Sequence, residues 1–447
     1  MKLCDNIFLG KSFHSEPYMT MCYNWGDLSM QHAKQLSARD FRWNFIVNSL
    51  DFAFFNLGMT FGSILTLFPI FAKNLGASNF QIGLIPAIAN LGWGFPSILG
   101  AKYAEKTSKK LDLVLKVTLG ERLPYFFMAL ISFFIVPYSS KLALYLTLIM
   151  LGIATFSMGF LGPPWMSMIE KVIDSRRRGS YFAMGNGLGA IMGIGGATLA
   201  KHFLENYPFP KNFGYSFLCA SVALMISFMF LALTREIPDE HVNNDLPFSK
   251  YVKGIKEVLI DGNFRNYIIN RILAALMLAS SGFIVIYTVK KFSVSDEIAA
   301  DFTAFLLASQ GLSSFILGPL GDKVGHKSVL IIGRITYISA ILLLLTVKNV
   351  FYIYLIFILV GIVNSTSMVG DLAFTLDLVS KKRKELYMGV LNLLISPFSF
   401  VAPLLGGKLA DLFNYETLFY FSLAIGTISL VFLIRFVQDP RKKASNL

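Results

Sequence analysis

The chain has few of the residues on which soluble enzymes and metal proteins depend. Only 15% of its 447 residues are charged, and it has five histidines and three cysteines. Cys4, Cys22 and Cys219 are widely separated, so they indicate neither a disulfide framework nor a metal site. The sequence contains no phosphate-binding loop of the form Gly-x4-Gly-Lys-Ser/Thr, which argues against direct ATP drive. We expect no enzymatic activity, no cofactor and no metal.

Apolar residues, by contrast, are abundant. They make up 55% of the chain, and the mean hydropathy is +0.59, well above the usual balance of a soluble domain. The net charge of +13 is compatible with nucleic-acid binding, but the basic residues cluster in short loops between apolar runs, where they report orientation in a membrane. We predict a multi-pass protein of the cell membrane and no nucleic-acid partner.

Twelve apolar runs are each long enough for a helix to cross about 30 Å of hydrocarbon at 1.5 Å per residue. The sequence therefore predicts an all-α protein with twelve transmembrane helices, near residues 44–72, 80–103, 112–137, 142–169, 179–204, 213–234, 265–290, 300–321, 328–347, 350–379, 385–410 and 415–437.

Basic residues are distributed unequally between the two sets of loops. With the amino terminus inside, eight positive charges fall outside and fourteen inside, and the positive-inside rule then places both termini in the cytoplasm. The inner set is Lys102, Lys106, Lys109, Lys110, Lys171, Arg176, Arg177, Arg178, Lys323, Lys327, Lys381, Lys382, Arg383 and Lys384; the outer set is Lys73, Lys141, Lys201, Lys211, Lys290, Lys291, Lys348 and Lys408.

The domain plan follows from these runs: a cytoplasmic tail (1–40), a six-helix bundle (41–234), a cytoplasmic linker (235–264), a second bundle (265–437) and a short tail (438–447). Within the linker, apolar residues from Phe248 to Leu259 recur at helical spacing with lysines between them. This pattern predicts an amphipathic helix on the inner membrane surface, although a soluble helix packed on the cytoplasmic loops fits it equally well.

A charged turn, Gly318 to Lys327, lies between two of the apolar runs. Its glycines permit a tight turn and close helix approach, and its charges must lie outside the hydrocarbon or be paired. Gly318, Leu320, Gly321, Asp322, Lys323, Gly325 and Lys327 match the signature Gly-x-Leu-Ala/Gly-Asp-Arg/Lys-x-Gly-x-Arg/Lys. The stretch thus resembles the signature of the major facilitator superfamily of secondary transporters.

That resemblance implies two six-helix bundles related by pseudo-twofold symmetry around a midplane cavity, and a monomer that moves a small molecule by alternating access, with proton coupling the leading hypothesis. Internal similarity agrees with a duplication. Residues 41–48 resemble 264–271, residues 101–110 resemble 318–327, and residues 195–200 resemble 406–410. A lipid or lipophilic-compound flippase of the same fold and a non-transporting sensor remain alternatives.

The resemblance further implies a cytoplasmic latch. Asp322 would accept hydrogen bonds at the start of the fifth crossing, around Arg178, where unpaired amides and the helix dipole favour a carboxylate; a solvated pairing with Lys323 or Lys327 is the alternative. The first-half copy of the motif, which includes Glu105 and Lys106, has alanine and serine in place of the glycines, so we expect its latch to be looser.

Polar residues inside the crossings are the candidate transport residues. Asn44, Asn48 and Asp51 share one helix face, and a carboxylate at membrane depth is costly enough to make Asp51 a candidate proton or cation site. Pairing of Asp51 with an arginine, or a position near the inner interface, is the alternative.

Two further crossings carry candidates of the same kind. In the third, we take Glu121 as a second proton candidate and Arg122 as a cavity residue, with a structural ion pair the alternative; Arg334 marks the ninth crossing. Neighbouring residues point about 100° apart, so Glu121 and Arg122 are not expected to face one partner. In the tenth, Asn364, Ser367 and Asp371 share a face and are predicted to line the cavity, or else to join neighbouring helices.

Overall fold

The structure is a computed structural model that describes residues 36–174, 177–239, 255, 258–379 and 384–440. Most of the predicted amino-terminal tail and of the predicted amphipathic linker helix lies outside these residues. The described residues are helical and contain no β-strand, which confirms the predicted all-α class.

Helices of the first half run from α1 to α8. Their bounds are α1 Ala38–Phe61, α2 Leu67–Asn74, α3 Asn79–Gly94, α4 Ser97–Lys106, α5 Lys110–Leu130 with a π-helical turn at Ile131–Ile135, α6 Ser140–Val172, α7 Arg178–Asn206 and α8 Lys211–Ala232. The first crossing is divided between α1 and α2, and the second between α3 and α4.

Helices of the second half run from α10 to α17. Its elements are α10 Gly262–Met277, a 3-10 segment Leu278–Phe283, α11 Ile284–Phe292, α12 Ile298–Val324, α13 His326–Thr346, α14 Phe351–Thr366, a π-helical segment Ser367–Asp371, α15 Leu372–Leu378, α16 Lys384–Leu412 and α17 Tyr415–Phe436. Within the described residues, eleven helical spans are long and apolar enough to cross a membrane. The predicted first crossing, which corresponds to α1 and α2, is not among these eleven spans.

Local signals explain several of the helix ends. Ser37 and Ser78 begin α1 and α3 with capping boxes that involve Asp40 and Gln81. Between α12 and α13, Gly325 adopts φ +99°, a backbone conformation that residues with a side chain rarely adopt. The glycine-containing motif therefore forms the tight turn that its sequence predicted.

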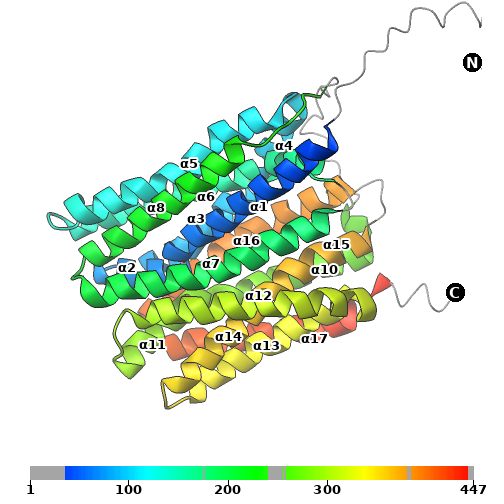
Figure 1. Cartoon of the computed structure of the whole chain (residues 1–447). Helices are drawn as coiled ribbons and strands as arrows, with labels where there is room; N and C mark the ends of the chain where they lie inside the picture. Colours follow the sequence, from blue (N-terminus) through cyan, green and yellow to red (C-terminus); the bar gives the residue numbers. More distant parts are fainter. Residues whose placement is uncertain (1–35, 175–176, 240–254, 256–257, 380–383, 441–447) are drawn as a thin grey trace, which may run out of the picture.

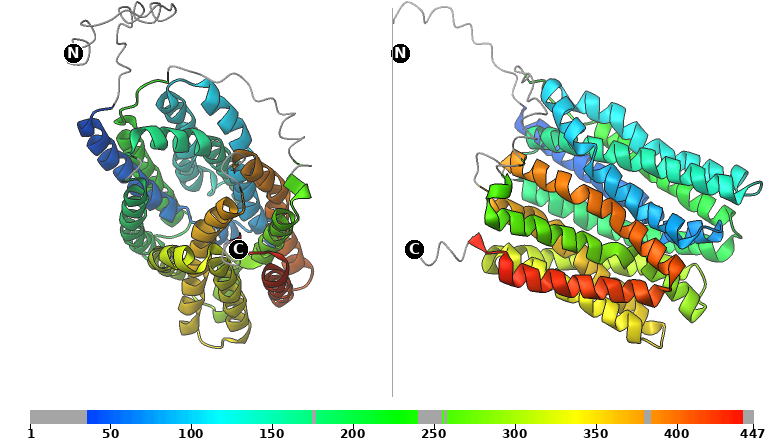
Figure 2. Two further views of the ribbon diagram at one scale, coloured as in Figure 1. Left: turned by 90° about the vertical axis from the view of Figure 1, so that its right-hand side faces the viewer. Right: turned by 180° about the vertical axis from the view of Figure 1, so that it is seen from behind.

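The helices run side by side, and the described chain begins and ends at the same end of the bundle (Figure 1). We call this the terminal end; it also carries α4 and α15. The opposite, distal end is formed by α2, the start of α3, α11 and the start of α12 (Figures 1 and 2). The predicted inner loop charges thus lie at the terminal end wherever they are described.

The most extensive contacts between the halves within the described residues are those of α3 with α16 and of α7 with α12. Glycines allow the first pair to approach closely. A Cβ added to Gly83 would lie 2.5 Å from the carbonyl oxygen of Pro403, and one added to Gly407 would lie 2.5 Å from that of Asn79. Small residues at these positions let two backbones touch.

Candidate functional site

A cavity of about 580 Å³ lies between the two halves. The first half contributes residues from the α1–α2 connection and α3, among them Asn90 and Trp93, and the second half contributes residues from α10, α12, α13, α14 and α16. Its polar lining includes Asn90, Ser281, Gln310, Asn364, Ser367 and Ser399. The predicted cavity residues of the tenth crossing, Asn364, Ser367 and Asp371, all line it.

Three charged side chains line this central cavity within the described residues: Arg271 of α10, Arg334 of α13 and Asp371 at the end of the π-helical segment. Nη1 of Arg271 forms an ion pair with Oδ2 of Asp371. Arg334 is only 2% exposed. The three side chains carry a formal charge of +1.

Arg271 was not predicted as a site residue. The available signal was the same one that selected Asp51, an ionisable side chain inside an apolar run. In the predicted repeat, Arg271 aligns with Asn48 of the first half.

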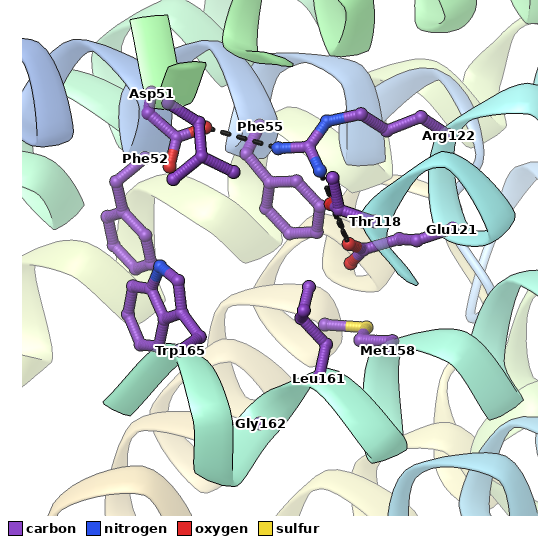
Figure 3. A pocket seen from close by; sticks show the side chains of 11 residues that line it. Asp51, Phe52, Phe55, Thr118, Glu121, Arg122, Met158, Leu161, Gly162 and Trp165 are labelled. Carbon is purple, nitrogen blue, oxygen red and sulfur yellow. Dashed lines mark hydrogen bonds and ion pairs between the residues drawn. The ribbon is translucent and has the colours of Figure 1, made fainter. Parts of the chain in front are cut away.

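A second charged cluster lies inside the first half, beside a cavity of about 230 Å³ (Figure 3). Nη2 of Arg122 lies 3.1 Å from Oδ1 of Asp51, and Nε donates to the carbonyl of Leu224 at 3.0 Å. Ser227 donates to the same Asp51 oxygen at 2.5 Å. Glu121 accepts from the Thr118 hydroxyl at 3.0 Å and lies 3.5 Å from Nη1 of Arg122.

This geometry corrects the expectation for Glu121 and Arg122 and decides between the alternatives for Asp51. Glu121 and Arg122 share one cluster although they are adjacent in sequence, because the long arginine side chain reaches back to Glu121 as well as across to Asp51. Asp51 is paired with an arginine, the alternative that the sequence left open. The cluster of Asp51, Glu121 and Arg122 carries a formal charge of −1, the opposite of the charge in the second half.

Asn44 and Asn48 line neither of these cavities, contrary to the predicted role. Both are fully buried. Asn44 donates to the carbonyl of Arg235 and accepts from its amide, each at 2.8 Å, while Asn48 donates to the Thr234 hydroxyl at 3.1 Å. The last backbone groups of a helix lack partners within that helix, so this polar stripe joins α1 to the chain that leaves α8.

At the terminal end, the glycine-containing motif surrounds a buried histidine. His326 is 7% exposed, and its Nδ1 lies 2.7 Å from Oδ2 of Asp377. A Cβ on Gly321 would lie 2.7 Å from the imidazole, so glycine makes room for the ring. Gly318 lies within α12, seven residues before the turn at Gly325. Lys327 donates to the carbonyl of Ile434 at 3.1 Å.

The described contacts of Asp322 and Arg178, the two members of the predicted latch, do not include a contact between them. The Asp322 side chain is 77% exposed and lies 3.6 Å from Nε2 of His326. Arg178 donates to the carbonyl of Glu170 in its own half. Lys323 and Lys106 are exposed at the ends of α12 and α4, and Glu105 also lies in α4. The latch stays a prediction for another conformer.

The sequence analysis did not predict a cluster of charged residues at the terminal end of the first half. Glu236 accepts from the first two backbone amides of α5, at 3.0 and 2.6 Å, and from Lys171 at 2.7 Å. Asp239 pairs with Lys110 and Lys171. Although partial burial alone would raise the pKa of Asp239, the hydrogen bonds and charges of the two lysines lower it below its ordinary value. The cluster anchors the exit from α8 to α5 and α6.

Polar contacts join the two halves at the distal end. Lys201 lies 2.8 Å from Asp301, Asn74 donates to Asp296 at 2.6 Å, and the hydroxyls of Thr66 and Thr303 are 2.5 Å apart. The carboxylate of Asp411 in α16 accepts from the amides of Asn79 and Phe80, at 3.1 and 2.8 Å. These amides start α3, where the helix dipole favours a negative charge.

The helices α7 and α12 separate toward the terminal end. A Cβ added to Gly193 would lie 3.0 Å from Leu307, one on Gly311 would lie 3.3 Å from Ala190, and one on Gly187 would lie 4.0 Å from Phe315. Gly318 lies seven residues after Gly311, on the same helix face, and a Cβ there would have no atom within 4 Å. Polar contacts thus join the halves distally, and α7 and α12 diverge toward the terminal end.

Comparison with known proteins identifies the family to which the chain is similar. The family model described as Major Facilitator Superfamily matches residues 29–197 and 267–447. One relative, the multidrug transporter protein MdtP of Bacillus subtilis, is 29% identical over 140 residues, which are 31% of this chain and 26% of that protein. The quinolone resistance protein NorA of Staphylococcus aureus is 25% identical over 145 residues, or 32% of this chain and 37% of NorA. The matched part therefore spans only 26% and 37% of the length of these curated relatives.

Solved structures share the fold over nearly the whole chain. A mutant of the nucleoside transporter NupG gives a TM-score of 0.68 at 13% identity, covering 89% of this chain and 99% of that one. The xylose transporter XylE from E. coli gives 0.65 at 13% identity, covering 90% and 99%.

Proposed function

This chain belongs to the major facilitator superfamily, and from that membership we propose that it moves a small molecule across a membrane by alternating access. The observation that supports this most directly is the central cavity of about 580 Å³, which is lined by both halves. A substrate site at the interface of two repeats, exposed to one side at a time by a relative movement of the halves, is how such folds transport.

We propose that the terminal end faces the cytoplasm of the cell membrane. The larger set of basic loop residues belongs to this end, as the positive-inside rule requires of cytoplasmic loops. On that orientation, the distal contacts close the outer side, and the splayed ends of α7 and α12 open toward the cytoplasm. The conformer is then inward-facing.

Proton coupling is the proposed energy source, with Glu121 as the site that takes the proton. Two buried carboxylates share one guanidinium in the first-half cluster, and a buried charge without a partner is costly. Asp51 has both Arg122 and Ser227 as close partners, whereas Glu121 has Thr118 and a more distant contact of 3.5 Å with Arg122. A proton on Glu121 would neutralise the cluster without breaking the Asp51–Arg122 pair.

Asp322 and Arg178 would close the cytoplasmic side in the outward-facing conformer. Between Lys201–Asp301 and Gly187–Phe315, α7 and α12 run antiparallel in a constant register, and extending that register supports an approach of Asp322 to the start of α7. A carboxylate at a helix start contributes roughly 1 to 2 kcal/mol. About 1.4 kcal/mol changes a two-state equilibrium tenfold, so this latch would bias the conformers without locking them.

Transport can be tested with the full chain in liposomes under an imposed pH gradient. The panel should contain small organic acids and, because the named relatives are multidrug and quinolone resistance proteins, lipophilic drugs. We expect at least one compound to accumulate in a manner that collapses when a protonophore dissipates the gradient. Flux equal to that of protein-free liposomes across the panel, in both gradient directions, would count against the proposal.

A further inference from the structure

One buried side chain in the central cavity has hydrogen-bond donors that no acceptor within the described residues satisfies. Arg334 is 2% exposed and lines the cavity, yet its Nε and Nη2 have no hydrogen-bond partner within the described part of the chain. Buried polar groups in folded proteins are almost always hydrogen-bonded. Two unpartnered donors on one buried guanidinium therefore point to a ligand.

Its neighbours do not supply the missing acceptor. Arg271 already holds Asp371 through Nη1, and Nε of Arg271 is likewise buried without a partner. Oδ1 of Asp371 is also buried without a partner, so the carboxylate, although nearby, bonds neither of the free arginine edges. With two guanidiniums and one carboxylate, the described lining retains one uncompensated positive charge.

The geometry of the free donors specifies the ligand chemistry. Nε and Nη2 lie on one edge of the guanidinium plane, and that edge donates two parallel hydrogen bonds to a carboxylate or a phosphate. The cavity also has apolar and aromatic lining, including Trp93, Leu278, Tyr337 and Met368. Its volume of about 580 Å³ lies within the range of small-molecule sites.

We propose that the central cavity binds small organic anions, with the carboxylate or phosphate group on Arg334 and Arg271 and the apolar body against Trp93 and Tyr337, and that the transported solute belongs to this class. The assignment of the solute depends on the transport function proposed above; the binding does not. The bound anion would satisfy the free donors and neutralise the excess charge of the second half.

Binding can be measured on the purified full chain in detergent, using probes matched in shape. Benzoate and phenyl phosphate should raise the melting temperature in a dose-dependent way, whereas benzamide and phenol should not. Inorganic phosphate should act more weakly than phenyl phosphate, because it lacks the apolar body. Equal effects of benzoate and benzamide on the wild-type protein, or no effect of any anion, would overturn the proposal, and this comparison requires no variant.

Variants then assign the site. Arg334→Gln should weaken benzoate binding about tenfold or more, as expected when a bidentate charged hydrogen bond is lost, and Arg334→Lys should weaken it less. Arg435→Gln removes the same charge from an exposed position of α17 and should leave binding unchanged. Retention of full benzoate affinity by a folded Arg334→Gln protein would refute the assignment.

Failure of the binding proposal and failure of the proposed function give different results. If anions bind through Arg334 but do not cross the liposome membrane, the binding proposal holds and the transport proposal fails. If only neutral or cationic compounds accumulate in the liposomes, the transport proposal holds and the assignment of the solute as an anion fails.

Discussion

Single buried charges are the most informative residues in this molecule. Within the described residues, each half has a cluster of three charged side chains that line a cavity: Asp51, Glu121 and Arg122 in the first, and Arg271, Arg334 and Asp371 in the second. A charge at membrane depth costs about 2.5 to 3.5 kcal/mol on insertion scales, and neither cluster is electrically balanced. Opposite residual charges in two moving halves suit a protein that takes up a proton in one and an anion in the other.

The pair Asp51 and Arg122 is expected to act as a unit in stability. Arg122→Gln should lower the free energy of unfolding by about 3 to 5 kcal/mol, because two carboxylates are left buried without a counter-charge, and Asp51→Asn should lower it less, because Arg122 keeps its contact with Glu121. The double variant should cost less than the sum of the two by about 1 to 3 kcal/mol. Unfolding in mixed micelles measures these values; strictly additive losses would argue against the pairing.

Glu121→Gln should separate accumulation from movement. One coupled proton supports about a tenfold accumulation for each unit of pH gradient, so the variant should lower the accumulation ratio to about one while downhill exchange continues. Asp112→Asn is the matched control, since it changes an exposed carboxylate on the same helix. Equal loss of uphill and downhill flux in Glu121→Gln would contradict a proton-carrier role.

At the level of the helices, close packing depends on particular glycines. A Cβ on Gly159 of α6 would lie 2.0 Å from the carbonyl oxygen of Gly92 in α3, whereas one on Gly152, also in α6, would lie 3.6 Å from Ile88. The first contact is backbone against backbone, so a side chain cannot rotate away to relieve it.

Alanine substitution should therefore distinguish these two glycines. Gly159→Ala should lower stability by about 1 to 3 kcal/mol through overpacking. Gly152→Ala should be neutral or slightly stabilising, because alanine is the better helix former and meets only ordinary contact distances. Melting temperatures in one detergent compare them directly, and an equal effect of both substitutions would show that the α3–α6 approach is looser than described.

Helix positions were predictable because each crossing must satisfy its backbone within apolar sequence of a fixed length. The run 179–204 became α7, Arg178–Asn206, and 415–437 became α17, Tyr415–Phe436. The interruption at 62–66 was missed because the residues on either side of it, 57–61 and 67–72, are mostly apolar, and the π-helical segment Ser367–Asp371 leaves no periodic signal.

The candidate site was less predictable than the helices. Helical spacing put Asn364, Ser367 and Asp371 on one face, but spacing cannot say which neighbouring element that face meets. Asn44 and Asn48 therefore met the end of α8, and the distal contacts made by Asp296, Asp301 and Asp411 were missed altogether, since they depend on how two distant halves dock.

For the whole molecule, two carboxylates at helix starts are expected to oppose each other. Asp411 meets the start of α3 at the distal end in this conformer, and Asp322 is proposed to meet the start of α7 at the terminal end in the other. On this proposal each contact exists in only one conformer, so its loss should favour the other one. A ligand or contact shifts a two-state equilibrium only by its differential free energy.

Asp411→Asn should accordingly raise the ratio of outward-facing to inward-facing molecules, by up to about tenfold for a loss of 1 to 1.4 kcal/mol, and Asp322→Asn should lower it. Spin labels on the exposed Glu205 and Ser295, in a protein whose native cysteines are replaced, report the distal separation as a distance distribution. The fraction of molecules with the longer distance should increase in Asp411→Asn and decrease in Asp322→Asn. Glu416→Gln is the control, because Glu416 bonds Tyr287 within its own half. Shifts in the same direction for both aspartate variants would mean that the two ends do not alternate.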